Sequence, residues 1–153
     1  MRNITITTLT KEKMEEVSPI LIAYERYMEN IGGPNWGYEH FMKELPRKWE
    51  LSFLMTQPLQ EIIGYAIVSE RDSRYHVHRP FLLPQYRFSH TRFLTKTLLH
   101  RAKESGLAEM SWITADKITG CEALQRFADK QQYLGNWDNA NFFYMSKRLN
   151  PAS

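Results

Sequence analysis

The sequence alternates between two hydrophobic patterns, one with the two-residue period of a strand and one with the 3.6-residue period of a helix. Residues 4–9 place apolar side chains between threonines, which predicts a strand with one buried face. Apolar residues then recur at helical spacing from Met14 to Met28, and Gly32 and Gly33 mark the end of that helix. The uninterrupted apolar run over 62–68 predicts a strand near the centre of a sheet.

The remaining segments continue this alternation of strands and helices. A short helix over 38–49 is interrupted or ended at Pro46, and a polar, basic connection over 84–92 leads into a later helix. We expect further strands at 51–55, 75–83, 110–114, 133–134 and 142–149, helices at 93–105 and 122–131, and turns at 57–60, 70–74 and 136–139.

The predicted order of elements, β-α-α-β-β-β-α-β-α-β-β, describes an α/β (α+β) fold. We expect a single domain over 1–153 with a mixed, mostly antiparallel sheet flanked by helices. The strands that begin at Tyr75 and Met110 should form the parallel pair, because the helix at 93–105 connects them.

Composition and charge narrow the class of protein. Apolar residues make up 42% and charged residues 24% of the 153 residues, which is typical of a folded domain, and the net charge of +3 permits phosphate-bearing ligands without requiring nucleic acid. The single cysteine, Cys121, excludes a disulfide within one chain and favours a reducing compartment. We find neither the apolar core of a signal peptide nor a run of roughly 20 apolar residues. We therefore expect a cytoplasmic protein without a membrane anchor.

The basic connection before the helix at 93–105 is a candidate anion site. A helix that begins near 89–91 would present free backbone N–H groups and a partial positive charge to a phosphate. Arg87, His90 and Arg92 add cationic side chains beside that end. Taken alone, the same residues are also consistent with a loop whose charged side chains are solvated and whose Ser or Thr caps the helix, without any anion site. The carboxyl ends of parallel strands, where ligands bind in such sheets, point to the same segment.

Four stretches carry a wider resemblance: Leu-Leu-Pro-Gln-Tyr-Arg at 82–87, Ala-Lys-Glu-Ser-Gly at 102–106, Ala-Leu-Gln-Arg-Phe at 123–127 and Phe-Tyr-Met-Ser-Lys-Arg-Leu at 143–149. In order and spacing they resemble the GNAT superfamily of Gcn5-related N-acetyltransferases over nearly the full chain. The resemblance implies transfer of an acetyl group from acetyl-CoA to a primary amine of a small molecule, peptide or protein.

The resemblance places the diphosphate of CoA at the segment before the helix. The loop of the family has Arg or Gln, two residues, Gly, one residue, and Gly or Ala. Here Arg87 fits, whereas His90 and Arg92 stand at the two small-residue positions, so that cationic side chains would replace part of the backbone cradle. The residues expected to contact the cofactor are Leu82, Leu83, Arg87, Phe88, Ser89, His90, Thr91 and Arg92.

Acyl transfer to an amine needs a base for the amine and an acid for the leaving thiolate. His76 and His78 lie two residues apart on one strand, so both side chains should share one face of the sheet and could relay a proton. The alternative is that both histidines are ordinary strand residues that pack against Tyr or Trp neighbours and have no catalytic role. The family often supplies the acid as a tyrosine where this chain has Phe127, and the resemblance therefore leaves Tyr133 or Tyr144 as substitutes.

The first two helices carry many aromatic residues, of which Tyr27, Trp36 and Tyr38 are candidates for an acceptor pocket. Glu25, with Glu29 and Glu39, could attract a cationic acceptor. We expect a small-molecule or protein amine as partner, with aminoacyl-tRNA as a variant, and a monomer or homodimer without membrane or metal binding.

Two alternatives to the enzyme stay open. The first is a catalytically inactive GNAT-fold binding protein, since that role would need neither loop glycines nor a tyrosine acid. The second is a nucleic-acid-binding module, for which the arginines are scattered over several elements: Arg71, Arg74, Arg79, Arg87, Arg92 and Arg101.

Overall fold

The computed structural model describes residues 3–27, 36–115, 130, 134–137 and 142–149. The strands in these ranges form one seven-stranded sheet in the order β1-β2-β3-β4-β5-β7-β6. Their bounds are β1 Thr5–Thr8, β2 Phe53–Gln57, β3 Glu61–Arg71, β4 Arg74–Leu82, β5 Glu109–Ala115, β6 Leu134–Trp137 and β7 Phe142–Arg148. Every pairing is antiparallel except that of β4 with β5, which confirms the predicted mixed sheet and its parallel pair.

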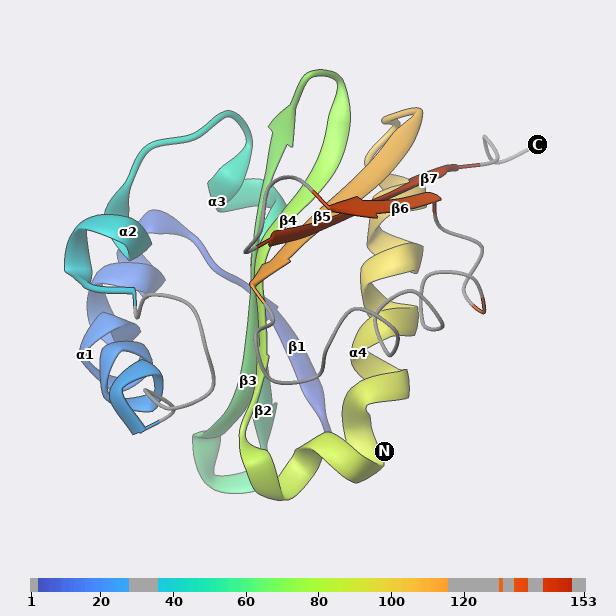
Figure 1. The fold of residues 1–153 in the computed structure, drawn as a ribbon. Helices are drawn as coiled ribbons and strands as arrows, with labels where there is room; N and C mark the ends of the chain where they lie inside the picture. The colour runs from blue at the N-terminus through green and yellow to red at the C-terminus, as the bar shows by residue number, and fades with distance from the viewer. Residues whose placement is uncertain (1–2, 28–35, 116–129, 131–133, 138–141, 150–153) are drawn as a thin grey trace.

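Helices cover both faces of this sheet (Figure 1). Helices α1 (Lys11–Tyr27) and α2 (Tyr38–Met42) lie on one face, where Met14, Leu21 and Phe41 pack against Tyr65. The long helix α4 (Pro84–Glu104) lies on the opposite face and contributes a second core cluster that includes Leu94, Leu98 and Ala102. Burial of these apolar stripes supplies most of the driving force for folding.

The central hairpin of β3 and β4 contains a β-bulge. Ile67 pairs with Arg79 and Val68 pairs with Val77, so His78 is the extra residue on β4. A bulge re-aims the side chains around it.

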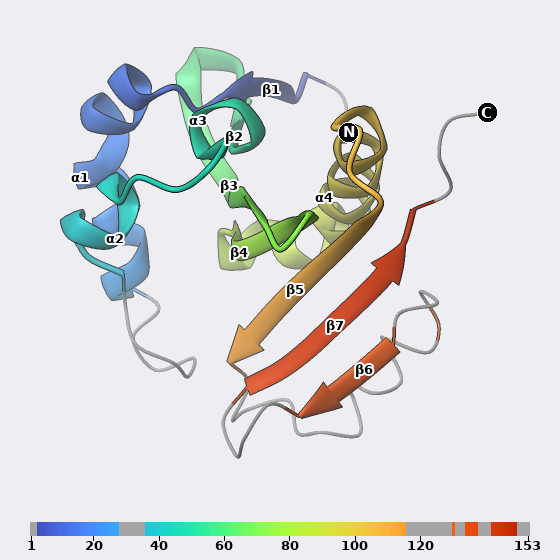
Figure 2. The same ribbon diagram turned by 90° about the horizontal axis from the view of Figure 1, so that it is seen from above.

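The parallel ladder between β4 and β5 is short. It consists of four residue pairs, the last of which joins Val77 to Trp112, although β4 continues to Leu82 and β5 to Ala115. Beyond that pair the two strands diverge, and Figure 2 shows β5 and β7 turned away from the first four strands. The point where they separate is called the fork below.

Helix α4 differs most from the prediction. It begins at Pro84, directly after the strand, whereas we expected a polar connection over 84–92 and a helix start near 89–91. Proline is favoured in the first turn of a helix because its fixed φ suits the helix and its missing N–H would have no partner there. No glycine follows to break the turn, so the polar residues continue the helix.

Smaller differences lie in the short elements. The helix expected over 38–49 is two helices, α2 and α3 (Lys48–Leu51), with Pro46 between them, and Leu51 ends α3 rather than beginning a strand. The 3-10 helix η2 (Pro58–Gln60) forms the expected turn at 57–60. Asn136 belongs to strand β6, not to a turn.

Part of the predicted helix at 122–131 lies outside the described residues, as do Tyr133 and Cys121. None of the helices within the described ranges is long and apolar enough to cross a membrane.

Candidate active site

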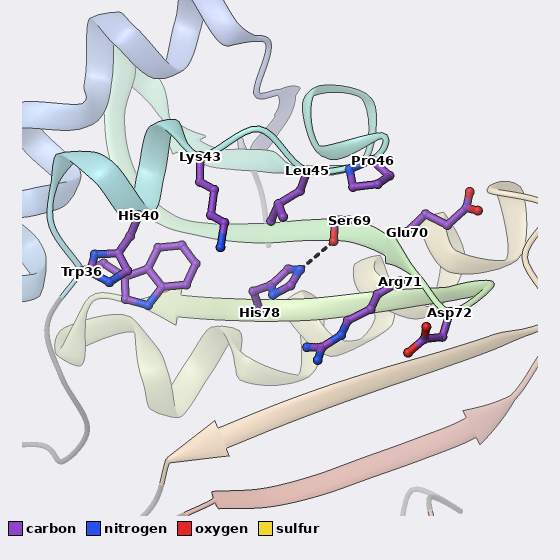
Figure 3. Close-up of a pocket in the computed structure, with 10 residues that line it drawn as sticks. All are labelled: Trp36, His40, Lys43, Leu45, Pro46, Ser69, Glu70, Arg71, Asp72 and His78. Carbon is purple, nitrogen blue, oxygen red and sulfur yellow. Dashed lines mark hydrogen bonds between the residues drawn. The ribbon is translucent and has the colours of Figure 1, made fainter.

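A pocket of about 570 Å³ opens on the sheet face that carries α1 and α2 (Figure 3). Its size suits a small-molecule ligand. Trp36 lies just before α2, His40 lies on α2, Lys43 follows that helix, and His78 lies on β4. The other lining residues are Leu45, Pro46, Ser69, Glu70, Arg71 and Asp72.

The two predicted histidines meet beside this pocket. The rings of His76 and His78 contact edge to face, with centroids 4.5 Å apart. The Oγ atom of Ser69 lies 2.6 Å from Nε2 of His78, and the Oγ atom of Ser111 lies 2.7 Å from Nδ1 of His76. The serines therefore hold both rings in place, and only His78 also lines the pocket.

Both imidazoles are neutral at pH 7. Burial is the main reason that the pKa of His76 falls to about 4, helped by the charges of Arg71 and Arg74. Burial likewise lowers the pKa of His78 to about 3, with further contributions from His76 and from nearby cations. A neutral imidazole can accept a proton, although one with so low a pKa is a weak base.

His78 stands at the fork. Val77 is the last residue of β4 that pairs with β5, and His78 follows it directly. His78 is also the bulge residue of the hairpin between β3 and β4. The bulge allows His76 and His78 to contact each other while Arg79, the next residue, reaches Glu25 on α1. One short segment thus joins the fork to the pocket.

Glu25 anchors α1 to the pocket wall. Its carboxylate is buried and accepts hydrogen bonds from Tyr65 Oη at 2.6 Å, Arg79 Nε at 2.9 Å and the backbone N–H of Trp36 at 3.1 Å. A second contact comes from the Arg79 Nη2 atom. The guanidinium of Arg79 also lies 5.6 Å from the ring centroid of Trp36. The contacts of Glu25 and Arg79 therefore position the Trp36 side chain, which lines the pocket.

Lys48 supports the pocket from beneath α2. This residue is fully buried, and its Nζ atom donates to the backbone oxygens of Phe41 and Lys43 at 2.7 Å each and of His40 at 3.3 Å. Burial lowers its pKa to about 8. The contacts fix the chain after α2, which carries Lys43 into the pocket wall.

No protein-family model and no curated protein matches the sequence. Solved structures do match. The ribosomal-protein-S18-alanine N-acetyltransferase from Escherichia coli aligns with a TM-score of 0.70 at 14% identity, covering 98% of this chain and 96% of that one. A GNAT-family acetyltransferase from Staphylococcus aureus aligns with a TM-score of 0.71 at 14% identity, covering 96% and 99%. The chain has the GNAT fold.

A third structure with this fold contains coenzyme A. It is the PaiA N-acetyltransferase from Thermoplasma acidophilum, with a TM-score of 0.65 and 17% identity over 95% of this chain and 98% of that one. The resemblance inferred from sequence is thus confirmed for the fold.

The start of α4 at Pro84 decides which of its backbone N–H groups are free. Because the helix begins at Pro84, the amides of residues 89–91 lie inside it, where helical geometry directs them to carbonyl oxygens four residues earlier. The free N–H groups belong instead to the first turn, and Tyr86 already donates its N–H to the Leu83 oxygen at 2.9 Å. A phosphate there would depend on side chains more than on backbone.

The predicted cofactor residues divide between strand and helix. Leu82 and Leu83 are buried at the end of β4, each in one of the two core clusters. Ser89, His90 and Arg92 lie on α4, where the Ser89 Oγ atom is 2.5 Å from Nδ1 of His90. The backbone of the other three is helical, and their side chains are outside the description: Arg87, Phe88 and Thr91.

The predicted acceptor and acid residues are not all brought together. Trp36 lines the pocket, whereas Tyr38 is exposed and its Oη atom donates to the carboxylate of Glu15, at 2.7 Å from Oε2. Tyr27 ends α1, and Tyr144 on β7 pairs with Ile113 of β5; for both, the backbone alone is described.

Several residues of the site were not singled out from the sequence. Lys43 is 33 residues from His76 in sequence, whereas Ser69 and Arg71 lie only seven and five residues before it. Arg71 was considered only for nucleic-acid binding, and polar residues of this kind carry no periodic signal. Only the antiparallel pairing of β3 with β4 could have indicated Ser69 as a neighbour of the histidine pair. Within the described parts of the chain, no three metal-ligating side chains gather at one place.

Proposed function

We propose that this protein is an N-acyltransferase that transfers an acetyl group from acetyl-CoA to a primary amine bound in the pocket. The position of His78 carries the proposal, since this residue lies both at the fork between β4 and β5 and on the wall of the pocket. A donor that entered the fork and an amine that entered the pocket would meet beside its imidazole.

The described residues fit an acyl-CoA in two respects. Strand backbone that extends beyond a ladder can pair with an extended amide chain, as in β-augmentation, and β4 extends five residues beyond its last pair with β5. The first four turns of α4 carry Arg87, His90, Arg92 and Lys96, and the helix has no acidic residue before Glu104. This charge, with the helix dipole, suits a diphosphate. When bound, the cofactor would supply an activated thioester.

His78 acts as the proton acceptor in this proposal. Its neutral ring takes the proton of the attacking amine, while Ser69 at 2.6 Å holds the ring and His76 contacts its edge. For the leaving thiolate we propose Tyr144 or Tyr133. Tyr144 of β7 pairs with Ile113 of β5, and β5 is one of the two strands that form the fork. This pairing supports Tyr144, whereas no described contact bears on Tyr133.

We further propose a cytoplasmic location and a small-molecule or protein amine as acceptor. The E. coli protein with the same fold is named for an alanine of a ribosomal protein, which supports an acceptor of this kind. A nucleic-acid partner is less well supported, since Arg74 pairs with Glu109 and Arg79 pairs with Glu25 rather than facing a ligand.

One observation favours a second function, that of a GNAT-fold protein that binds a partner without catalysis. Helix α4 runs from Pro84 without the glycine loop of the family, which reduces the number of backbone N–H groups available to a phosphate.

Calorimetry with acetyl-CoA and CoA, followed by release of free thiol in the presence of a panel of amines, separates the two functions. We expect binding of both nucleotides and amine-dependent thiol release. His78→Ala should lower kcat by about 100-fold, in the range of general-base catalysis. His100→Ala, at an exposed site on α4, is the matched control and should leave kcat unchanged. A folded protein that binds neither nucleotide would refute the enzyme and favour the binding protein.

A further inference from the structure

Of the charged residues that line the pocket, Glu70 forms an ion pair, whereas Lys43 and Arg71 form none with the described residues. Glu70 pairs with Arg47 at 3.4 Å, and Figure 3 shows its carboxylate turned away from His78. In the same view the Lys43 side chain extends toward the strand that carries His78. The two cations therefore remain available to a ligand.

The nearest buried acid is not available to a cationic acceptor. Glu25 was a candidate to attract one, but its carboxylate is 1% exposed and accepts four hydrogen bonds, two of them from Arg79. Its charge is thus neutralised within the wall. Asp72, the other acid of the lining, is exposed in the turn between β3 and β4 and lies near Arg71 in Figure 3.

The imidazole of His78 experiences a positive electrostatic field. Burial lowers the pKa of His78 most, and the neighbouring His76 and the charges of Arg71, Lys48 and Lys43 lower it further. A positive field of this kind lowers the pKa of an amine placed beside the imidazole, which increases the fraction of free, nucleophilic amine. The same field repels an acceptor that carries a second positive charge.

We propose that the acceptor is a primary amine that also bears an anionic group, either a carboxylate or a phosphate, which Lys43 and Arg71 hold while the amine faces His78. This inference rests on the proposed acyltransferase function and narrows its substrate class. Trp36 and His40, whose rings stack with centroids 5.6 Å apart, provide an aromatic wall for the rest of the acceptor. Polyamines and simple diamines are excluded as good acceptors.

The test compares amines that differ only in the anionic group. Phenylalanine is compared with phenethylamine, and O-phosphoethanolamine with ethanolamine, by binding calorimetry and by acetyl transfer from acetyl-CoA. We expect the anionic member of at least one pair to bind and react about tenfold better, equivalent to ~1.4 kcal/mol. The pair that shows the preference identifies the anion as carboxylate or phosphate.

Charge-removing variants then assign the effect to the two cations. Lys43→Gln and Arg71→Gln should each raise KM for the acceptor that bears the anionic group several-fold, change kcat little and leave the analogue that lacks this group unaffected. Lys103→Gln, at an exposed position in the last turn of α4, is the control and should preserve the preference. The absence of a preference for the anionic member in both pairs, or a preference that survives both pocket variants, would overturn the inference.

The proposed function and this inference fail in different ways. If acetyl-CoA does not bind and no amine is acetylated, the acyltransferase is refuted, and calorimetry of the amine pairs alone decides whether the pocket selects an anion. If acetyl transfer occurs with diamines and not with anionic amines, the acyltransferase stands and the substrate class is wrong.

Discussion

The buried carboxylate of Glu25 gives the sharpest test of what holds the pocket wall together. All its partners are donors: Tyr65 Oη, Arg79 Nε and Nη2, and the Trp36 N–H. In Glu25→Gln one oxygen becomes an NH₂ group that faces donors only, and the positive charge of Arg79 loses its counter-charge. Removing one partner of a buried ion pair costs about 3–5 kcal/mol. For a chain of this length that corresponds to a fall in Tm of about 10 °C.

Glu44→Gln is the matched control. It makes the same chemical change in an ion pair with Lys11, whose N···O distance is 2.7 Å, but the Glu44 side chain is 61% exposed whereas that of Glu25 is 1% exposed. Exposed pairs contribute less than about 1 kcal/mol because water solvates the separated charges. Urea unfolding followed by circular dichroism measures both variants.

Equal losses in the two variants, or a loss below about 1 kcal/mol in Glu25→Gln, would refute the reasoning that burial sets the cost. A double replacement gives a second check. Glu25→Leu combined with Arg79→Leu should lose less stability than the sum of the two single changes, because no charge is left buried alone.

Three further predictions follow from the described geometry. First, the pKa of His76 is about 4 in the folded state and about 6.5 in the unfolded state, so the unfolded chain binds the proton first as the pH falls. His76 should therefore contribute a loss of stability of about 3 kcal/mol between pH 6.5 and 4, in addition to the loss that comes from His78. His76→Asn should remove the His76 part of this dependence in urea unfolding at pH 7.5 and 4.5. Second, because the pKa of His78 is about 3, kcat/KM should show no ionisation of His78 between pH 5 and 8. A break near pH 6.5 that disappears in His78→Ala would contradict this. Third, Gly64→Ala should destabilise the protein by about 1–3 kcal/mol, because the new Cβ atom would lie 2.6 Å from a backbone oxygen of the neighbouring strand. Gly37→Ala places its Cβ atom where no other atom lies within 4 Å and should change stability by about 0.5 kcal/mol or less. Similar losses in the two variants would refute the clash.

At the start of α4 the sequence carries two conflicting local signals, the polar composition of residues 84–92 and the proline at position 84, and we gave too much weight to the first. We interpreted residues 84–92 as a connection because they are polar and basic. Pro84 was the better signal, since proline in the first turn favours a helix and nothing after it interrupts one. The basic side chains of this segment were recognised, whereas the backbone amides expected to accompany them lie within the helix.

The sequence by itself determined the order of most elements, the mixed sheet, the parallel pair and the shared face of His76 and His78. These follow from periodicity and from the connection through one helix, which are properties of neighbouring residues. Only the tertiary structure decided that His78 stands at the fork, that Glu25 is neutralised by Arg79, and that Lys43 and Arg71 line the same pocket. Such relations join residues up to 54 positions apart, as in the contact of Glu25 with Arg79, and they depend on a bulge and on strand divergence. No pattern along the chain encodes them, because they arise when separate elements pack against each other.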